Sequence, residues 1–212
     1  MFVSNGLYLL YHKFIYMKFR ILFLFLIIPM FYLKAQSKNK VEEYLGIPGP
    51  INIGQKAYNL VWSSHPNDVY FKQEYIEPKE NVNKYNSMVL IDFIKGDFNL
   101  KEVIDHKLAE LDEMKKINPI VNYQILENDG EYILDFLISE NSKDGKEILI
   151  AERNVYRYKL ITNSTTNGLL LFAISQRAYK ENMDQFFKNL KANPNQLIEA
   201  VGSYKLPDIK IK

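Results

Sequence analysis

The sequence predicts an α+β fold, in which a mostly antiparallel sheet of about seven strands carries helices on its faces, as a three-layer sandwich. Three observations support this prediction. Several segments alternate in polarity, or are apolar throughout, over the length of a strand. Residues 128–130, Asn-Asp-Gly, join two of these segments with residues typical of a tight hairpin turn. One segment, residues 99–118, has the apolar spacing of a helix.

The first strands are predicted at 57–64 and 69–76, which alternate in polarity and are separated by the turn His-Pro-Asn-Asp. The next strand, 87–95, is apolar on both faces apart from Asp92, as expected of a central strand. A lead-in rich in glycine and proline precedes them and has room for one short strand at 51–53. Consecutive hairpins make the sheet mostly antiparallel.

The segment 99–118 is predicted to be an amphipathic helix that covers a sheet. Its apolar residues recur at helical spacing and form one stripe: Leu100, Val103, Ile104, Leu108, Leu111 and Met114. Asn99 and Glu102 have the spacing of a capping box at its start. Asn118 ends the helix, because the residue before a proline avoids the helical region of backbone conformation.

After this helix, a hairpin is predicted around residues 128–130. A long strand at 147–162, the turn Asn-Ser-Thr-Thr-Asn-Gly and a strand at 169–180 follow. Two short helices, at 183–191 and 194–201, complete the domain. The predicted order is therefore β-β-β-α-β-β-β-β-α-α. Strands that are apolar on both faces favour helices on each side of the sheet.

This order of elements resembles that of the PsbP-like sandwich domains over residues 57–203. Those domains belong to exported or organellar proteins that mostly act as non-catalytic assembly or binding factors. The resemblance implies a three-layer sandwich and a binding or assembly role. It lies in element order alone, so it transfers no functional residue, and one fold can host many functions.

Residues 17–35 are predicted to be a secretory signal peptide. The apolar run at 21–33 is shorter than the about 20 residues that a membrane-spanning helix needs. Lys18 and Arg20 precede the run and Ala35 follows it, as in a cleavable leader. Cleavage is expected after Ala35, whose junction with the following glutamine resembles those of exported proteins of the Bacteroidetes. The expected location is therefore periplasmic or extracellular.

Translation is expected to begin at Met17, which leaves residues 1–16 as a mis-assigned upstream start. The mature chain then divides into a polar and Gly/Pro-rich lead-in at 36–56, a single α/β domain at 57–206 and a tail at 207–212. An alternative keeps the leader uncleaved, which would make the protein a membrane-tethered accessory factor of the cell envelope.

Composition excludes several functional classes. Residues 1–35 hold four basic residues and no acidic one, so the mature chain has 23 basic and 25 acidic residues and a formal charge of −2. A near-neutral chain without a basic stripe is a poor nucleic-acid binder. The absence of cysteine excludes disulfides, thiol catalysis and cysteine-based zinc sites. The mature chain has only His65 and His106, so no metal site and no cofactor are predicted.

One candidate catalytic group lies at the turn after the first strand. A serine hydrolase needs a hydroxyl beside a base that a third group orients, and Ser63, His65 and Asp68 offer these residue types. Ser63 and His65 point to the same face but are two residues apart, and the Gly-x-Ser-x-Gly motif is absent. The favoured interpretation is a polar turn in which Asn67 or Asp68 accepts hydrogen bonds from backbone N–H groups.

A second candidate group consists of charged residues that interrupt apolar strands: Asp92, Asp135, Arg153, Arg157 and Arg177. A carboxylate drawn out of water must find a partner or take up a proton, and the planar arginine fork suits bidentate pairing. The structural alternative is that these residues form ion pairs without a ligand, where the strands emerge from beneath the helices.

Counting back from the turn at 163–168 puts Arg177 opposite Asn154, beside Tyr156 and Ser175. These residues predict a polar pocket lined by aromatic side chains, for a small anionic or sugar-like ligand. We therefore expect an exported, non-catalytic binding or assembly domain whose partner is a protein or small ligand of the cell envelope. The serine hydrolase and the membrane-tethered factor are the alternatives.

Overall fold

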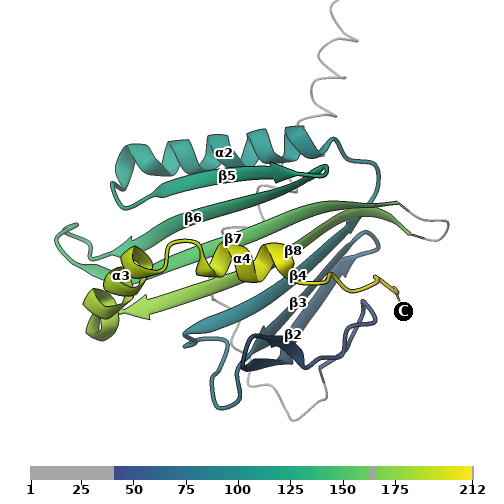
Figure 1. Ribbon diagram of the computed structural model, residues 1–212, viewed down its shortest axis with the longest axis horizontal. Helices are drawn as coiled ribbons and strands as arrows, with labels where there is room; N and C mark the ends of the chain where they lie inside the picture. Colours follow the sequence, from purple (N-terminus) through teal and green to yellow (C-terminus); the bar gives the residue numbers. More distant parts are fainter. Residues whose placement is uncertain (1–40, 163–165, 212) are drawn as a thin grey trace, which may run out of the picture. The chain divides into compact units, whose positions relative to one another are not determined.

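The computed structural model describes residues 41–162 and 166–211. Within these residues, eight strands form one antiparallel sheet in the order β1-β2-β3-β4-β8-β7-β6-β5, and three α-helices accompany it (Figure 1). The prediction of a sheet-dominated α+β fold is confirmed. The described sheet has eight strands rather than about seven, because β1 (Ile51–Ile53) pairs with the start of β2. The predicted signal peptide and the upstream segment lie outside the described residues.

The sheet consists of two meanders of four strands that meet in its middle. The first contains β1, β2 (Lys56–Asn67), β3 (Tyr70–Ile76) and β4 (Ser87–Lys95). The second contains β5 (Asn122–Asn128), β6 (Glu131–Asn141), β7 (Ile148–Thr162) and β8 (Asn167–Tyr179). Helix α2 (Leu100–Ile117) takes the chain from β4 to the opposite edge, so that the second meander returns and pairs β8 with β4.

The sequence signals for α2 are confirmed at both ends. The side chain of Asn99 accepts a hydrogen bond from the backbone of Glu102, and the helix ends before Asn118. The chain finishes with a short 3₁₀ turn, η1 (Lys180–Asn182), and the helices α3 (Met183–Ala192) and α4 (Gln196–Ser203). Figure 1 shows α2 running beside β5 and α4 lying across β7 and β8. No helix within the described residues is long and apolar enough to cross a membrane.

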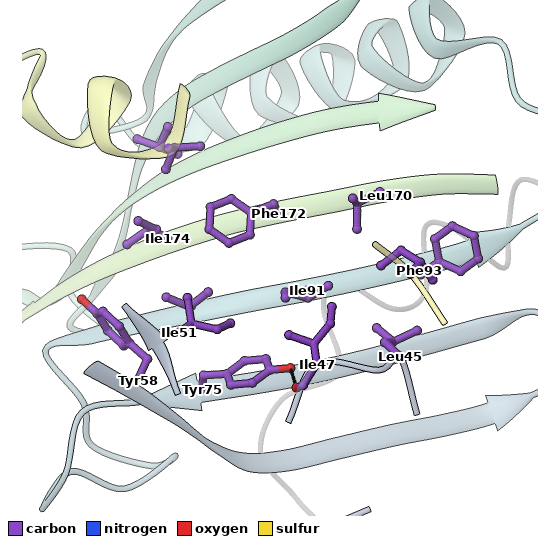
Figure 2. Packing of buried hydrophobic residues seen from close by; sticks show 14 of the residues in the cluster. Leu45, Ile47, Ile51, Tyr58, Tyr75, Ile91, Phe93, Leu170, Phe172 and Ile174 are labelled. Carbon is purple, nitrogen blue, oxygen red and sulfur yellow. Dashed lines mark hydrogen bonds between the residues drawn. The ribbon is translucent and has the colours of Figure 1, made fainter. Parts of the chain in front are cut away.

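Two hydrophobic clusters use alternate residues of the central strands, which point to opposite faces of a sheet. On one side, which we call the α4 face, the cluster joins α4 to strands β3, β4 and β8. It includes Phe71, Tyr75, Val89, Ile91, Phe93, Leu170, Phe172 and Ile174 from the strands and Leu197, Ile198 and Val201 from the helix. Figure 2 labels six of the strand residues: Tyr75, Ile91, Phe93, Leu170, Phe172 and Ile174. On the other side, which we call the α2 face, Leu134, Phe136, Tyr156, Tyr158, Leu171 and Ala173 pack with Leu100, Val103, Ile104 and Leu111 of α2.

The core of the α4 face also includes residues from the lead-in and the tail. Leu45 and Ile47 are buried in it, and Ile209 packs against it from the other end of the chain. The hydroxyl of Tyr75 donates to the carbonyl of Ile47 at 2.6 Å (Figure 2), and the Gln73 side chain accepts from the backbone of residues 44 and 45. Burial therefore extends beyond the 57–206 segment, because β3 supplies polar groups that hold the lead-in in place.

Candidate functional site

The charged residues singled out in the sequence divide between the two faces of the sheet. Asp135, Arg153 and Arg157 lie on the α4 face. Asp135 is opposite Val155 and Arg157 is opposite Phe172, and both partners belong to the core of that face. Arg153 lies two residues before Val155 along β7 and so points to the same side. The others of the predicted set, Asp92, Tyr156 and Arg177, share the α2 face. The six residues therefore do not form one pocket.

On the α4 face, Asp135 and Arg153 form a bidentate pair across β6 and β7. The Arg153 Nε–Asp135 Oδ1 distance is 2.8 Å and the Nη2–Oδ2 distance is 3.0 Å, and both side chains are buried. The same Nη2 donates to the carbonyl of Pro194, just before α4. This pair joins two strands and fixes the entrance to α4, so the structural alternative accounts for both residues.

Arg157 holds the other end of α4. Its Nη1 donates to the carbonyls of Val201, Gly202 and Tyr204, at 3.2, 2.9 and 2.9 Å. Its Nε donates to Glu131 at 2.5 Å. The last carbonyls of a helix lack partners within the helix, and a cation there also favours the helix dipole. Arg157 is thus a cap for α4.

Arg177 lies opposite Glu152 rather than Asn154, and Asn154 lies opposite Ser175. The prediction was wrong by two residues because pairing of β7 with β8 begins at Thr162 and Asn167, and so continues through residues assigned to the turn. Arg177 Nε donates to Glu152 Oε2 at 2.5 Å, and its guanidinium lies 4.2 Å from the ring centroid of Tyr85. Arg177 is therefore engaged by its own neighbours.

Asp92 differs from these residues because half of its carboxylate has no partner. The residue lies in β4, between Lys72 of β3 and Leu171 of β8. Its Oδ2 accepts a hydrogen bond from the hydroxyl of Tyr70 at 2.9 Å. Its Oδ1 is buried and accepts none from any described residue. Burial raises the pKa of Asp92 to about 6, although the Lys72 cation and the Tyr70 hydroxyl act in the opposite direction.

The nearest cation, Lys72, is already paired. Its Nζ lies 3.1 Å from Oε1 of Glu74 and 5.9 Å from the ring centroid of Trp62. Burial alone would lower the pKa of Lys72, but the negative charges of Asp92 and Glu74 raise it above its usual value. No ion pair within the described residues joins Lys72 to Asp92, so the cation reduces the cost of the buried carboxylate without neutralising it.

Tyr156 and Tyr158 of β7 extend this group towards α2. Both are almost fully buried, and burial raises their pKa values, with Asp92 among the charges that add to the shift. The ring centroids of Tyr156 and Tyr158 lie 6.2 Å apart, and the ring of Tyr156 meets that of Phe136 edge-on at 4.9 Å. We call Tyr70, Lys72, Asp92, Tyr156 and Tyr158 the Asp92 site.

A second unpartnered atom lies on the same face. Asn154 is 1 % exposed, and its Oδ1 accepts from Ser175 Oγ at 2.5 Å. Its Nδ2 has no hydrogen-bond partner among the described residues. The two residues lie on strands that flank β8: Asn154 is opposite Ser175, and Asp92 is opposite Leu171. Their partners in β8 are four residues apart.

Helix α2 contributes a buried cation of its own. Lys107 Nζ lies 3.0 Å from Glu110 Oε1 and 5.2 Å from the ring centroid of Phe136. Burial lowers the pKa of Lys107, and Glu110 only partly opposes this. Sequence analysis did not single out Tyr70, Lys72 or Tyr158 as site residues. Alternation along β3 could have shown that Tyr70 and Lys72 lie on one face of the sheet. Only the pairing of β3 with β4 places them beside Asp92.

The hydrolase candidates have other partners. Ser63 Oγ donates to the backbone carbonyl of Glu42 at 2.7 Å. The His65 ring stacks on Phe71 with centroids 4.1 Å apart, and its Nδ1 lies 3.0 Å from the carbonyl of Tyr70. These contacts give no support to a Ser63–His65 pair.

The polar turn predicted after the first strand is confirmed for Asn67. Its Oδ1 accepts from the backbone N–H groups of Val69 and Tyr70, at 3.1 and 2.9 Å, while Asp68 is exposed in the turn. Among the described residues, no group of three or more histidine, aspartate or glutamate side chains could hold a metal ion.

Comparison with known proteins gives one match. No curated protein and no solved structure matches the chain. A protein-family model matches residues 45–206, which include every strand from β1 to β8, all three described α-helices and the whole Asp92 site. The chain therefore belongs to this protein family, which is of uncharacterised type.

Proposed function

We propose that this protein is an exported, non-catalytic domain that binds a small polar ligand of the cell envelope at the Asp92 site. The observation that carries this proposal is the buried Oδ1 of Asp92, which lacks a hydrogen-bond partner among the described residues. A buried polar atom without a partner costs about 1–3 kcal/mol, and more when it belongs to a charged group. A ligand that supplies the missing partner would recover that free energy on binding.

Asp135 provides the comparison within the same sheet. It also interrupts an apolar strand, but a bidentate arginine satisfies it. A carboxylate kept for structure alone is expected to resemble Asp135. A carboxylate whose pKa is raised by burial, and whose second oxygen is left open, is more typical of a functional site.

The arrangement of the layers supports access to this site. The two core clusters, which use opposite faces of the sheet, favour the three-layer sandwich expected from the sequence. On the α2 face, however, the side chains of β2, β3 and β4 near Asp92 are only half-buried: Trp62, Ser64, Tyr70, Lys72, Glu74 and Asp92 itself. A ligand can approach this surface without opening the core, and displacement of one of these half-buried side chains would bring it to the buried Oδ1 of Asp92.

Binding is tested by NMR titration of the purified, isotopically labelled protein with cocktails of small cations, anions and sugars. We expect amide shifts confined to β3, β4 and β7 around the Asp92 site. Shifts on the α4 face alone, or none with any class of compound, would overturn the proposal. Covalent labelling of Ser63 by a fluorophosphonate probe would replace it with the hydrolase alternative.

Export is proposed from the features of residues 17–35, and it is tested separately. N-terminal sequencing of the native protein is expected to begin at Gln36. A native chain that begins at Met17 and fractionates with the membrane would favour the tethered accessory factor instead. Either result leaves the Asp92 site unchanged, because that site lies wholly within the family match.

A further inference from the structure

We infer that β5 pairs with β5 of a second copy of this chain, so that the two eight-stranded sheets join into one across a two-fold axis. The inference concerns the edge of the sheet farthest from β1, and it does not depend on the proposed function. It comes from the open backbone groups of β5, from the apolar residues gathered there and from the register in which the strand can pair with itself.

The two edges of the sheet differ. Most of the first edge belongs to β2, whose pairing with β3 breaks register at two places. The three-residue strand β1 covers the start of β2, and the lead-in lies against it farther along, where the carbonyl of Glu42 accepts from Ser63 Oγ. Bulges, short edge strands and covering segments are devices by which proteins prevent edge-to-edge pairing.

The second edge, β5, has none of these devices. Its residues, Asn122–Asn128, pair with β6 in one unbroken register. The strand contains no proline and no lysine, and Glu127 is its only charged residue. The backbone N–H and C=O groups that point away from β6 form no hydrogen bond with any described residue. They therefore present a regular row of donors and acceptors that another strand can pair with.

Apolar side chains gather at the same edge. Five large apolar residues are exposed within the part of the chain that the structure describes, and three of them lie here: Ile117 at the end of α2, and Ile125 and Leu126 in β5. Ile125 is 39 % and Leu126 43 % exposed, and as neighbours in a strand they point to opposite faces of the sheet. A strand added to β5 would thus cover apolar surface on both faces, which is typical of an interaction site.

The sequence of β5 is suited to antiparallel pairing with its own copy. All of its residues find partners only when the register is centred on Ile125, which then lies opposite Ile125 of the second copy. In that register Tyr123 lies opposite Glu127, and Gln124 lies opposite Leu126. The two Glu127 side chains are then at opposite ends of the paired segment, so no like charges face each other.

The charges beside Tyr123 also favour a second copy. The hydroxyl of Tyr123 donates to Asp112 Oδ1 at 2.7 Å, and Lys115 Nζ lies 5.8 Å from the centroid of the ring. Neither Lys115 nor Glu127 has an ion pair within residues 41–162 and 166–211. Pairing through β5 brings the second copy's Glu127 to Tyr123 and so towards Lys115, and the two-fold axis repeats this contact.

The absence of cysteine from the chain allows a direct test of this register. Ile125→Cys places the one thiol of each copy at the two-fold axis, where opposite Cα atoms of antiparallel strands are about 4.5–5.5 Å apart, within the range of a disulfide. We expect mild oxidation of the purified protein to cross-link this variant into a dimer. The matched control is Leu126→Cys, whose thiol would lie opposite Gln124 and should not cross-link. Any other pattern, including equal cross-linking of both variants or of neither, would overturn the inference.

Sedimentation velocity of the protein with its native N-terminus measures the association itself. We expect wild type to form a dimer that dissociates on dilution. Ile125→Lys should raise the dimer dissociation constant about tenfold or more, because two ammonium groups would face each other at the axis. Leu160→Lys makes the same change at a 38 % exposed position of β7 and should leave the constant unchanged. A wild-type chain that stays monomeric at about 0.5 mM, or a dimer that Ile125→Lys does not weaken, would contradict pairing through β5.

Reversal of charge identifies the contact between the copies. Glu127→Lys should weaken the dimer, since it brings a second cation towards Lys115. Combining it with Lys115→Glu should restore association, because the two copies then exchange the signs of the same pair. A double variant that associates no better than Glu127→Lys alone would refute the register centred on Ile125.

Discussion

Replacement of Asp92 by asparagine is expected to stabilise the protein at neutral pH. The ordinary pKa of an aspartate is 3.8, whereas burial raises that of Asp92 in the folded protein to about 6. A difference of about two pH units corresponds to about 3 kcal/mol of unfavourable free energy for the ionised form. Asparagine removes this cost but puts an amide nitrogen where Oδ1 lacks a partner, at about 1 kcal/mol. The net gain is about 2 kcal/mol.

The pH dependence follows from the direction of the shift. Because the folded-state pKa is raised, the folded protein binds the Asp92 proton more tightly than the unfolded chain does. Wild-type stability therefore falls as the pH rises from about 4 to about 6, and the full penalty is present above that range. Asparagine does not titrate. The stability difference between the variant and wild type should thus be smallest at pH 4 and reach its plateau near pH 7.

Urea unfolding of wild type, Asp92→Asn and Asp105→Asn at pH values from 4 to 8 measures these differences. Subtracting wild type from each variant removes the contribution of the other titrating groups, which all three proteins share. The exposed pair of Asp105 with Lys101 is expected to contribute little. A less stable Asp92→Asn protein at pH 8, or a difference that does not change with pH, would refute the account of Asp92 as an uncompensated buried charge.

Three further substitutions test the structural roles assigned above. Asp135→Ala leaves the Arg153 guanidinium buried without its carboxylate and should cost about 3–5 kcal/mol in urea unfolding; an unchanged midpoint would place the pair in solvent. Arg157→Ala should cost about 3 kcal/mol and increase hydrogen exchange in α4, since three carbonyls at its end lose their donor; exchange limited to β7 would contradict the capping role. Gly168→Ala should lower the melting temperature by several degrees, because its Cβ would lie 2.3 Å from the carbonyl of Ile94 in β4, whereas Gly202→Ala meets only a flexible side-chain end.

Local sequence patterns predicted the elements with local causes. The apolar stripe and the residues at both ends placed α2 correctly, since helix formation depends on neighbours three and four positions apart. The Asn-Asp-Gly turn likewise predicted the β5–β6 hairpin, which the structure contains with Asn128 paired to Glu131. The long-range pairing of β8 with β4 has no such local signal, and neither has the two-residue shift in the β7–β8 register. Both depend on contacts that the whole chain determines.

The lead-in has no periodic pattern and is rich in glycine and proline, so its sequence gives no local signal that any of it is buried. Single apolar residues, Leu45 and Ile47, nevertheless reach the core. Their burial depends on Gln73 and Tyr75, buried polar residues of β3 that bind the lead-in backbone. From the sequence alone, a polar residue inside an apolar strand is a candidate site residue. Only its hydrogen-bond partners in the structure distinguish a structural role from a functional one.

This distinction explains why the predicted set of charged residues divided as it did. On the α4 face, the guanidinium groups of Arg153 and Arg157 donate to backbone carbonyls just before α4 and at its end. These N–H groups therefore hold α4 on the sheet. Asp92 lies instead in β4, on the face where α2 packs mainly along β5 and β7. There β4 joins the two meanders and is paired on both sides, which holds the carboxylate in a fixed position. A rigid position, a cost in stability and an open hydrogen-bonding atom occur together at Asp92, and the proposed binding of a small polar ligand accounts for all three.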